Sequence, residues 1–340
     1  MLDLILKVRG EVLGGGTLSY EDALSLTGLP SLQVPYLAAA ANEVREKFVG
    51  NKIESCALSN IKSGQCSEDC RFCAQSAHYE TDSPVYPQIP VEAMVEQAKE
   101  AEKAGATEFC LVSSGWGAVN EKDFQAILEA VRRIAKETRL CVDCSLGFLS
   151  DDQMKRLKEA GLYRNNHNLE TSRRYFEKVC TTHTFDERFR HLKRAQLNGI
   201  HPCSGGILGM GETVQDRLDL AFSLKEAGAE CVPINILNPR QGTPLEEAQT
   251  PPPMEIIKMI AIYRLILPKS TIKIAGGREV NLRDLQAMAM LAGANGLIIG
   301  NYLTTMGRNP AKDVQMLKDL GFHVESNGTQ KSEGTKQVPA

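Results

Sequence analysis

Short apolar segments alternate with amphipathic segments along most of the chain. Eight of the apolar segments have the length and composition of buried strands, and they lie at residues 55–61, 108–113, 139–145, 163–168, 201–206, 231–236, 272–275 and 296–299. The intervening segments have helical spacing, as in residues 91–104, where Val91, Met94, Val95 and Ala98 share one face. Repeated strand–helix units predict an α/β fold with a parallel sheet, and eight of them predict a closed (β/α)8 barrel of the TIM type. The alternative is an incomplete six-stranded α/β barrel with additional elements.

Local signals mark where two of the helices begin and end. Ser150 and Gln153 have the spacing of a capping box, and Gly161 lies where that helix is expected to stop. A further helix is expected to follow Glu212 and to end near Gly228. These signals fit the strand–helix alternation of a barrel.

The two ends of the chain differ from this repeating region. Residues 1–50 carry helical patterns and are expected to form an N-terminal helical extension that caps the barrel. Residues 325–340 are rich in Ser, Asn, Gly, Lys, Gln and Pro, which is typical of a flexible tail. The barrel domain is therefore expected over residues 51–324.

The composition narrows the class of protein. The chain has 340 residues, of which 42% are hydrophobic, and 39 basic against 42 acidic residues give a net charge of −3. No basic stripe predicts a nucleic-acid partner, and no apolar run approaches the roughly 18 residues that span a bilayer. Ten cysteines without a secretory pattern favour a cytoplasmic protein in which clustered cysteines bind metal or take part in chemistry.

Three cysteines lie together directly after the first expected strand. Cys66, Cys70 and Cys73 have the spacing C-x3-C-x2-C. Four thiolates would fill the irons of a cubane cluster, so three leave one iron open to a small molecule. In TIM barrels the loops after the strands carry the active site, which is where this run falls. The alternative is a structural zinc site with His78 as the fourth ligand.

A second set of cysteines is expected to converge inside the barrel. These residues lie on or beside the second, third and fifth expected strands: Cys110, Cys141, Cys144 and Cys203. A free cysteine is also a common small core residue, which is the alternative for each of them. Cys56, Cys180 and Cys231 do not show this convergence and are expected to be core or surface residues.

The triplet resembles the signature of the radical S-adenosylmethionine enzymes. Over residues 1–325 the chain resembles the biotin synthase family more specifically. The matching motifs are K-S-G-Q-C at 62–66, N-H-N-L-E-T-S at 166–172, P-C-S-G-G at 202–206, V-P-I-N at 232–235, G-T-P-L at 242–245, G-G-R-E at 276–279 and Y-L-T-T at 302–305. Several separate motifs in the same order are much harder to match by chance than one.

The resemblance implies a reaction and its partners. In this family a [4Fe-4S] cluster at the triplet binds S-adenosylmethionine, and electron transfer releases a 5′-deoxyadenosyl radical. Two such radicals remove hydrogen from dethiobiotin, and an auxiliary iron–sulfur cluster supplies the sulfur that closes the ring of biotin. A flavodoxin or ferredoxin-type electron donor and a homodimer are implied. The alternatives are a related radical enzyme of the hydrogenase-maturase or methylornithine-synthase type, or a non-catalytic iron–sulfur carrier.

The chain departs from the family at the auxiliary cluster. The common form holds a [2Fe-2S] cluster with three cysteines and one arginine, and Cys110 and Cys203 match two of those cysteines. Asp143 stands at the position of the third cysteine, and Lys273 stands at the position of the arginine. Lysine is a poor substitute there because its charge is a compact point on a flexible stem.

Two additional cysteines suggest a different cluster rather than a lost one. Cys141 and Cys144 flank Asp143, so we expect a cubane-type cluster with an extra sulfide, held by Cys110, Cys141, Cys144 and Cys203. Positions 141 and 144 point to opposite faces of a regular strand. Both can bind one cluster only if the strand bulges or ends there; otherwise Cys144 packs against the helices.

The resemblance also assigns binding residues. Asn168 and Glu170, two apart on one expected strand, are expected to share a face that holds S-adenosylmethionine, with Glu170 in place of the usual aspartate. Phe72 and Arg188 are expected to bind the same cofactor, the guanidinium of Arg188 near its carboxylate. The residues implied in binding dethiobiotin are Asn168, Asn235, Thr304 and Thr305.

Overall fold

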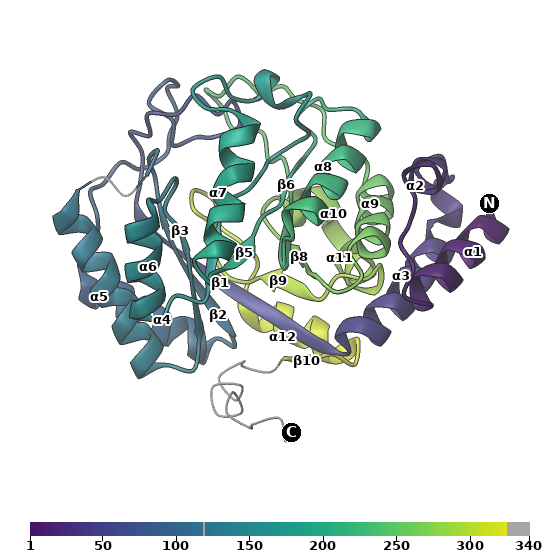
Figure 1. The fold of residues 1–340 in the computed structure, drawn as a ribbon, viewed down its shortest axis with the longest axis horizontal. Coiled ribbons are helices and arrows are strands. Elements are labelled where there is room, and N and C mark those ends of the chain that lie inside the picture. Colours follow the sequence, from purple (N-terminus) through teal and green to yellow (C-terminus); the bar gives the residue numbers. More distant parts are fainter. Residues whose placement is uncertain (118–119, 325–340) are drawn as a thin grey trace.

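The computed structural model describes residues 1–117 and 120–324. Eight parallel strands form a closed ring in the order β1-β2-β3-β4-β5-β7-β8-β9, with β9 paired to β1 (Figure 1). Their bounds are β1 (Lys52–Lys62), β2 (Glu108–Ser113), β3 (Cys141–Ser145), β4 (Arg164–Asn166), β5 (His201–Cys203), β7 (Cys231–Ile236), β8 (Thr271–Ile274) and β9 (Gly296–Ile298). Each lies in or overlaps one predicted strand, so the (β/α)8 barrel is confirmed and the six-stranded alternative is wrong.

The predicted strand at 201–206 is divided in two. β5 ends at Cys203, and β6 (Gly206–Leu208) continues along β7. Gly205 lies in the break, where a Cβ atom would approach the carbonyl oxygen of Pro233 to 1.8 Å. The chain can pass this close to β7 only with glycine at this position. The short strand β10 (His323–Val324) pairs with the beginning of β1.

Helices surround the ring (Figure 1). They are α4 (Val91–Lys103), α5 (Glu121–Glu137), α6 (Asp151–Ala160), α7 (Phe185–Leu197), α8 (Val214–Ala227), α9 (Pro253–Ile266), α10 (Arg278–Leu282), α11 (Gln286–Leu291) and α12 (Pro310–Asp319), with 3-10 turns η1 (Ser31–Gln33), η2 (Phe176–Lys178) and η3 (Arg283–Leu285). The predicted capping box is confirmed, because Ser150 and Gln153 exchange both hydrogen bonds. Gly161 and Gly228 end α6 and α8 in the left-handed conformation, as expected.

The N-terminal helices lie along the side of the barrel rather than over one end. They are α1 (Leu2–Leu13), α2 (Tyr20–Thr27) and α3 (Val34–Val49), and they pack against α8, α9 and α11 (Figure 1). Lys258, buried in α9, donates hydrogen bonds to the carbonyl oxygens of Thr27 at 2.7 Å and Leu29 at 2.9 Å. This contact fastens the extension to the barrel. The tail expected at 325–340 lies outside the described residues.

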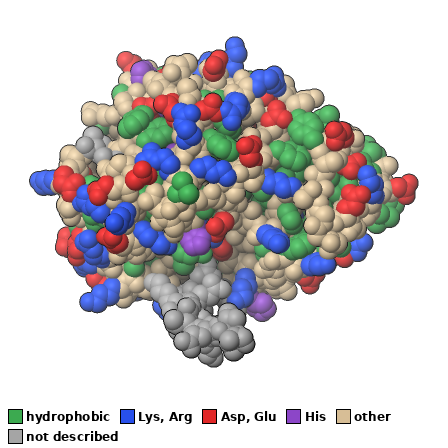
Figure 2. Space-filling view, in the orientation of Figure 1, with side chains coloured by type: hydrophobic (Ala, Val, Ile, Leu, Met, Phe, Trp, Pro, Cys, Tyr) green, Lys and Arg blue, Asp and Glu red, His purple; other side chains and the backbone are tan. Residues whose placement is uncertain are grey.

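The two faces of the strands differ in chemistry. On β2, Phe109 and Leu111 belong to the large core between strands and helices, whereas Cys110 belongs to a separate cluster inside the ring. On the face shown in Figure 2, acidic and basic side chains are intermixed rather than gathered by sign. Among the described residues, no helix has the length and apolarity required to cross a bilayer.

Candidate active site

The cysteine triplet lies in the loop that follows β1. The backbone N–H of Cys66 donates to the Gln75 carbonyl at 3.0 Å, and that of Ala77 donates to the Cys66 carbonyl at 2.8 Å, so the loop folds back on itself. Cys73 lies within electrostatic range of both Cys66 and Cys70. Burial raises the pKa of Cys66 and raises that of Cys73 to about 11. Thiolates at these positions therefore need a bound metal to stabilise them.

The spacing of the sulfurs favours a cluster over a single ion. Among the described residues, the groups compact enough for one metal ion are Cys70–Cys180–His183 and Cys56–Glu108–Asp143, and the triplet is not one of them. Zinc requires four ligands around one centre, and the proposed fourth ligand His78 instead contacts the Ser67 carbonyl through Nε2 at 2.9 Å. The geometry therefore suits a cubane better than zinc.

The chain segment before α7 supports the triplet loop, which the sequence did not predict. Cys180 lies beside Cys70 and contacts Asp69 Oδ1 at 3.2 Å. His183 Nδ1 bonds Glu68 Oε2 at 2.6 Å, and His183 Nε2 accepts from Arg188 Nε at 2.8 Å. Cys180 is a buried core residue, as expected, and it also supports the triplet loop. The run C-T-T-H-T at 180–184 is the signal that could have indicated it.

Three of the residues expected to hold the cofactor meet beside this loop. Arg188 is only 12% exposed, and its Nη1 donates to the Asn168 carbonyl at 2.7 Å and lies 3.8 Å from Glu170 Oε1. Asn168 and Glu170 lie beyond β4 rather than on a strand, because Glu170 has a φ of +68°, which a strand does not allow. Glu170 Oε2 is buried without a hydrogen-bond partner. Burial raises the pKa of Glu170, and its carboxylate lies near Cys73.

A cavity of about 200 Å³ joins the triplet loop to the residues expected to bind substrate. Its lining includes Phe72, Cys73, Asn235, Thr304 and Thr305. Asn235 is fixed at its wall, where Oδ1 accepts from the backbone N–H of Gly276 at 3.0 Å and Nδ2 donates to the carbonyl of Gly206 at 3.3 Å. The structure therefore brings residues from four distant motifs to one site.

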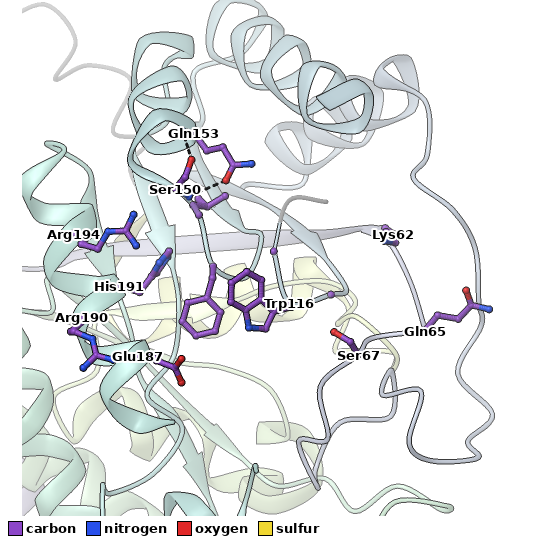
Figure 3. A pocket seen from close by; sticks show the side chains of 14 residues that line it. Lys62, Gln65, Ser67, Trp116, Ser150, Gln153, Glu187, Arg190, His191 and Arg194 are labelled. Atoms are coloured by element: carbon purple, nitrogen blue, oxygen red, sulfur yellow. Dashed lines mark hydrogen bonds between the residues drawn. The ribbon is translucent and has the colours of Figure 1, made fainter. Parts of the chain in front are cut away.

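A larger cavity, of about 820 Å³, opens on the other side of the same loop (Figure 3). Gln65 and Ser67, which flank Cys66, form one wall, and His191 from α7 lies on the opposite side. Trp116, with 52% of its surface exposed, and basic side chains such as Arg190 also line it. This cavity could not be predicted from local sequence patterns, because its walls come from segments far apart in the chain, among them α7.

Four charged side chains lie in the barrel lumen toward the N-terminal ends of the strands. Arg164 Nη1 lies 2.7 Å from Glu54 Oε2, and it also bonds Glu108. Lys273 bonds Glu108 and lies 4.0 Å from Glu54. Although burial raises the pKa of Glu108, the two cations lower it to about 2. Lys273 is therefore committed to an ion-pair network.

The expected auxiliary-cluster cysteines do not all lie in the lumen. Cys110 and Cys203 do, and Asp143 lies beside them. β3 keeps a regular register with β2 and β4, so it has no bulge, and Cys144 packs in the core between strands and helices. Cys141 lies opposite Glu108 and near Tyr163, toward the N-terminal end of the barrel. Cys144 therefore lies in the arrangement given above as the alternative to its binding the cluster, with its side chain packed toward the helices.

Two cysteines that were expected to lie apart do converge here. Cys56 packs with Cys110, and its sulfur lies within 4.8 Å of Glu108 and Asp143 oxygens. Cys231 is the register partner of Cys203 in the sheet, so their thiols are neighbours. Cys56 and Cys231 are buried core residues, as expected. Their convergence with Cys110 and Cys203 was not expected, because proximity across a closed ring depends on strand order, which spacing along the chain does not reveal.

Comparison with known proteins places the chain among described families. Residues 60–224 match the Radical SAM superfamily, and residues 233–323 match the Biotin and Thiamin Synthesis associated domain. A biotin synthase of Heliobacterium modesticaldum is 46% identical over 96% of this chain and 100% of its own length. A biotin synthase of Carboxydothermus hydrogenoformans is 44% identical over 95% of this chain and 100% of its own length.

Solved structures agree on the fold. Methylornithine synthase superposes with a TM-score of 0.81 at 22% identity, over 95% of this chain and 98% of that one. The [FeFe]-hydrogenase maturase HydG from Carboxydothermus hydrogenoformans gives 0.78 at 19% identity, over 94% and 78%. At these identities the likeness is one of fold.

Proposed function

The chain belongs to the biotin synthase family of radical S-adenosylmethionine enzymes, and from this membership we propose that it converts dethiobiotin to biotin by inserting one sulfur atom. The observation that carries the proposal is the cavity in which the triplet loop, through Cys73, meets Asn235, Thr304 and Thr305. The amide of Asn235 offers both a donor and an acceptor, as a cyclic urea requires. The two threonine hydroxyls suit a carboxylate at the other end of the substrate.

We assign the cofactors to the residues around this cavity. Cys66, Cys70 and Cys73 would hold a [4Fe-4S] cluster, which when bound supplies the electron that cleaves S-adenosylmethionine. Arg188 would orient the carboxylate of the cofactor, and the unpartnered oxygen of Glu170 would accept from its ribose hydroxyls. Phe72 provides an apolar wall. Asn168, which lies beside Arg188 and Glu170, would contact both the cofactor and the substrate.

The lumen is the proposed location of the sulfur donor. We propose a cubane-type auxiliary cluster with an additional sulfide, in which Cys110 and Cys203 are two of the ligands. Asp143 at the position of the usual third cysteine and Lys273 in its ion-pair network argue against the common [2Fe-2S] ligand set. The buried Asp143 Oδ1 lacks a partner, which fits a lumen shaped for a bound group.

The remaining proposals concern partners and compartment. The family implies a flavodoxin or ferredoxin-type reductant and a homodimer. The described cysteines form no disulfide with one another, which supports a reducing compartment such as the cytoplasm.

A single-turnover assay tests the function. Anaerobic protein with reductant, S-adenosylmethionine and dethiobiotin should form biotin, together with 5′-deoxyadenosine whose release depends on dethiobiotin. Release of 5′-deoxyadenosine without biotin would point to a related radical enzyme and overturn the proposal. No release at all, with iron bound, would indicate an iron–sulfur carrier. A ratio of sulfide to iron above one, measured on the same sample, supports the additional sulfide.

A further inference from the structure

Four cysteines in the lumen come from two pairs of neighbouring strands. Cys56 lies on β1 and Cys110 on the adjacent β2, whereas Cys203 lies on β5 and Cys231 on the adjacent β7. In the ring order β1-β2-β3-β4-β5-β7-β8-β9, these two pairs occupy opposite walls of the barrel. The arrangement is that of two thiol pairs facing each other across a closed space.

The two remaining walls carry Asp143 on β3 and Lys273 on β8. Together with Cys56 and Cys203, they come from alternate strands, the set that forms one layer of inward side chains in a TIM barrel. Asp143 Oδ1 is buried and has no hydrogen-bond partner. A buried oxygen in this state indicates that a group absent from the protein itself completes the layer.

The spread of the four sulfurs distinguishes a cluster from a single ion. Among the described residues, this set of thiols is not compact enough to share one ion. Cys56 with Glu108 and Asp143 is compact enough, but Glu108 is already bound by Lys273 and Arg164. A cluster of four irons fits a wider set of four thiols than a single ion does.

The two cysteines of β3 do not belong to this set. Cys144 points into the outer core, and β3 has no irregularity that could turn it inward. Cys141 lies two residues before Asp143, near Tyr163, which also neighbours Glu54 and Glu108. Its position is thus toward the N-terminal end of the lumen, beside the ion pairs.

We infer that the auxiliary cluster of this chain is held by the four lumenal thiolates, those of Cys56, Cys110, Cys203 and Cys231. The inference rests on the proposed function, which requires an auxiliary cluster as the source of sulfur. Lys273 then stands beside the cluster, bound to Glu108, and does not replace the arginine ligand of the common form. Cys141 and Cys144 are not ligands.

Iron content in a protein without the triplet tests the ligand set. In the variant Cys66→Ala/Cys70→Ala/Cys73→Ala, all bound iron belongs to the lumen, and we expect about four irons per chain with the Mössbauer spectrum of a cubane. Adding Cys231→Ala or Cys56→Ala should lower this to about three irons or fewer. Cys144→Ala and Cys141→Ala, matched controls on the same barrel, should keep about four.

Three results would overturn the ligand set, two of them from iron analysis. One is unchanged iron and an unchanged Mössbauer spectrum in Cys56→Ala and Cys231→Ala; the other is the same loss in Cys144→Ala as in Cys231→Ala. A single zinc ion that disappears with Cys56→Ala would also overturn it, because a mononuclear site would then occupy the lumen.

A second measurement guards against misfolding and separates this inference from the proposed function. With the triplet intact, Cys231→Ser and Cys56→Ser should still cleave S-adenosylmethionine while binding about seven irons or fewer in place of about eight. This result would show an intact triplet site and a damaged lumenal site. If wild-type protein makes no biotin but these iron losses occur, the ligand set stands and the function fails. If wild-type protein makes biotin and no iron is lost, the function stands and the ligand set fails.

Discussion

The two cysteine groups are built on different supports. Cys66, Cys70 and Cys73 lie in one loop after β1, at the C-terminal end of the strands, which we call the mouth of the barrel. Backbone hydrogen bonds, such as that from Cys66 to Gln75, hold this loop. The lumenal thiols lie on four strands of a closed sheet, where each strand fixes its neighbours. A loop can adjust to small molecules that enter and leave, whereas a closed ring holds its ligands at set distances. On this comparison, we expect small molecules to enter and leave at the triplet loop, and we expect the lumenal side chains to stay at fixed distances.

The two regions also neutralise charge differently. At the mouth, Asp69 and Glu68 accept hydrogen bonds from threonine and histidine side chains, among them Thr182 to Glu68 at 2.7 Å. In the lumen, two carboxylates face two buried cations. Hydrogen-bonded carboxylates tolerate the loss of one partner better than a buried ion-pair network does. Substitutions in the lumen are therefore expected to affect folding, and those at the mouth to affect chemistry.

The largest expected effect is that of Cys70→Ala. Removing one of three thiolates should abolish the mouth cluster, so 5′-deoxyadenosine release should fall to the background of the assay. The lumen is built separately, so roughly half of the bound iron should remain. Iron analysis and chromatography of the nucleoside check both parts. Loss of all the iron would show that the two sites assemble together, contrary to the comparison drawn above.

Lys273→Met should have the next largest effect. It leaves Glu108 and Glu54 with one cation between them in a buried site, and breaking such a network costs about 3–5 kcal/mol of the free energy of unfolding. Anaerobic urea denaturation followed by circular dichroism measures this. Lys273→Arg retains the charge and is the control, expected to lose much less. Equal stability of Lys273→Met and the wild type would show that Arg164 alone neutralises Glu54 and Glu108.

Two glycine substitutions compare the rigidity of the regions directly. Gly205→Ala would place a Cβ 1.8 Å from the Pro233 backbone oxygen, so the strands must separate, at a cost of about 3 kcal/mol or more. Gly64→Ala, in the triplet loop, meets the side chain of Val85 and a φ of +76°, which costs roughly 1–2 kcal/mol. The same denaturation experiment ranks them. A larger loss for Gly64→Ala would contradict the view that the loop adjusts more easily.

The barrel fold and the position of the cysteine triplet could be predicted from the sequence, because both depend on patterns within short segments. Apolar strand segments alternate with helices in order, and Cys66, Cys70 and Cys73 are neighbours in the chain. The lumen was predicted only in part. Alternation along a strand correctly raised the possibility that Cys144 faces outward, but Cys56 and Cys231 are brought together with Cys110 and Cys203 only by closure of the ring.

Other features escaped prediction for similar reasons. The break at Gly205 depends on a close approach to β7, and the role of Cys180 beside Cys70 depends on how the segment before α7 packs under the loop. Both are contacts between segments far apart in the sequence. Patterns within a segment do not encode them.

The smallest expected effect concerns pH at the mouth. Burial lowers the pKa of His191 to about 4, and its Nε2 bonds Asn165 Nδ2 at 3.1 Å. Below the ordinary histidine pKa of about 6.5, the unfolded chain binds a proton that the folded protein does not, so stability falls as the pH decreases from 6.5 toward 4. Between pH 7.5 and 5.5 this residue should cost about 1.4 kcal/mol of the free energy of unfolding.

His191→Gln isolates that contribution because glutamine is polar and does not titrate. The variant should lose about 1.4 kcal/mol less than the wild type over the same pH interval, measured by anaerobic urea denaturation. Between pH 7.5 and 8.5, where the imidazole is neutral in both states, the two proteins should change in parallel. An equal loss on acidification in both would mean that His191 accepts a proton within the folded mouth. The region around the triplet loop would then accept an additional positive charge, whereas the lumen keeps its buried charges in ion pairs.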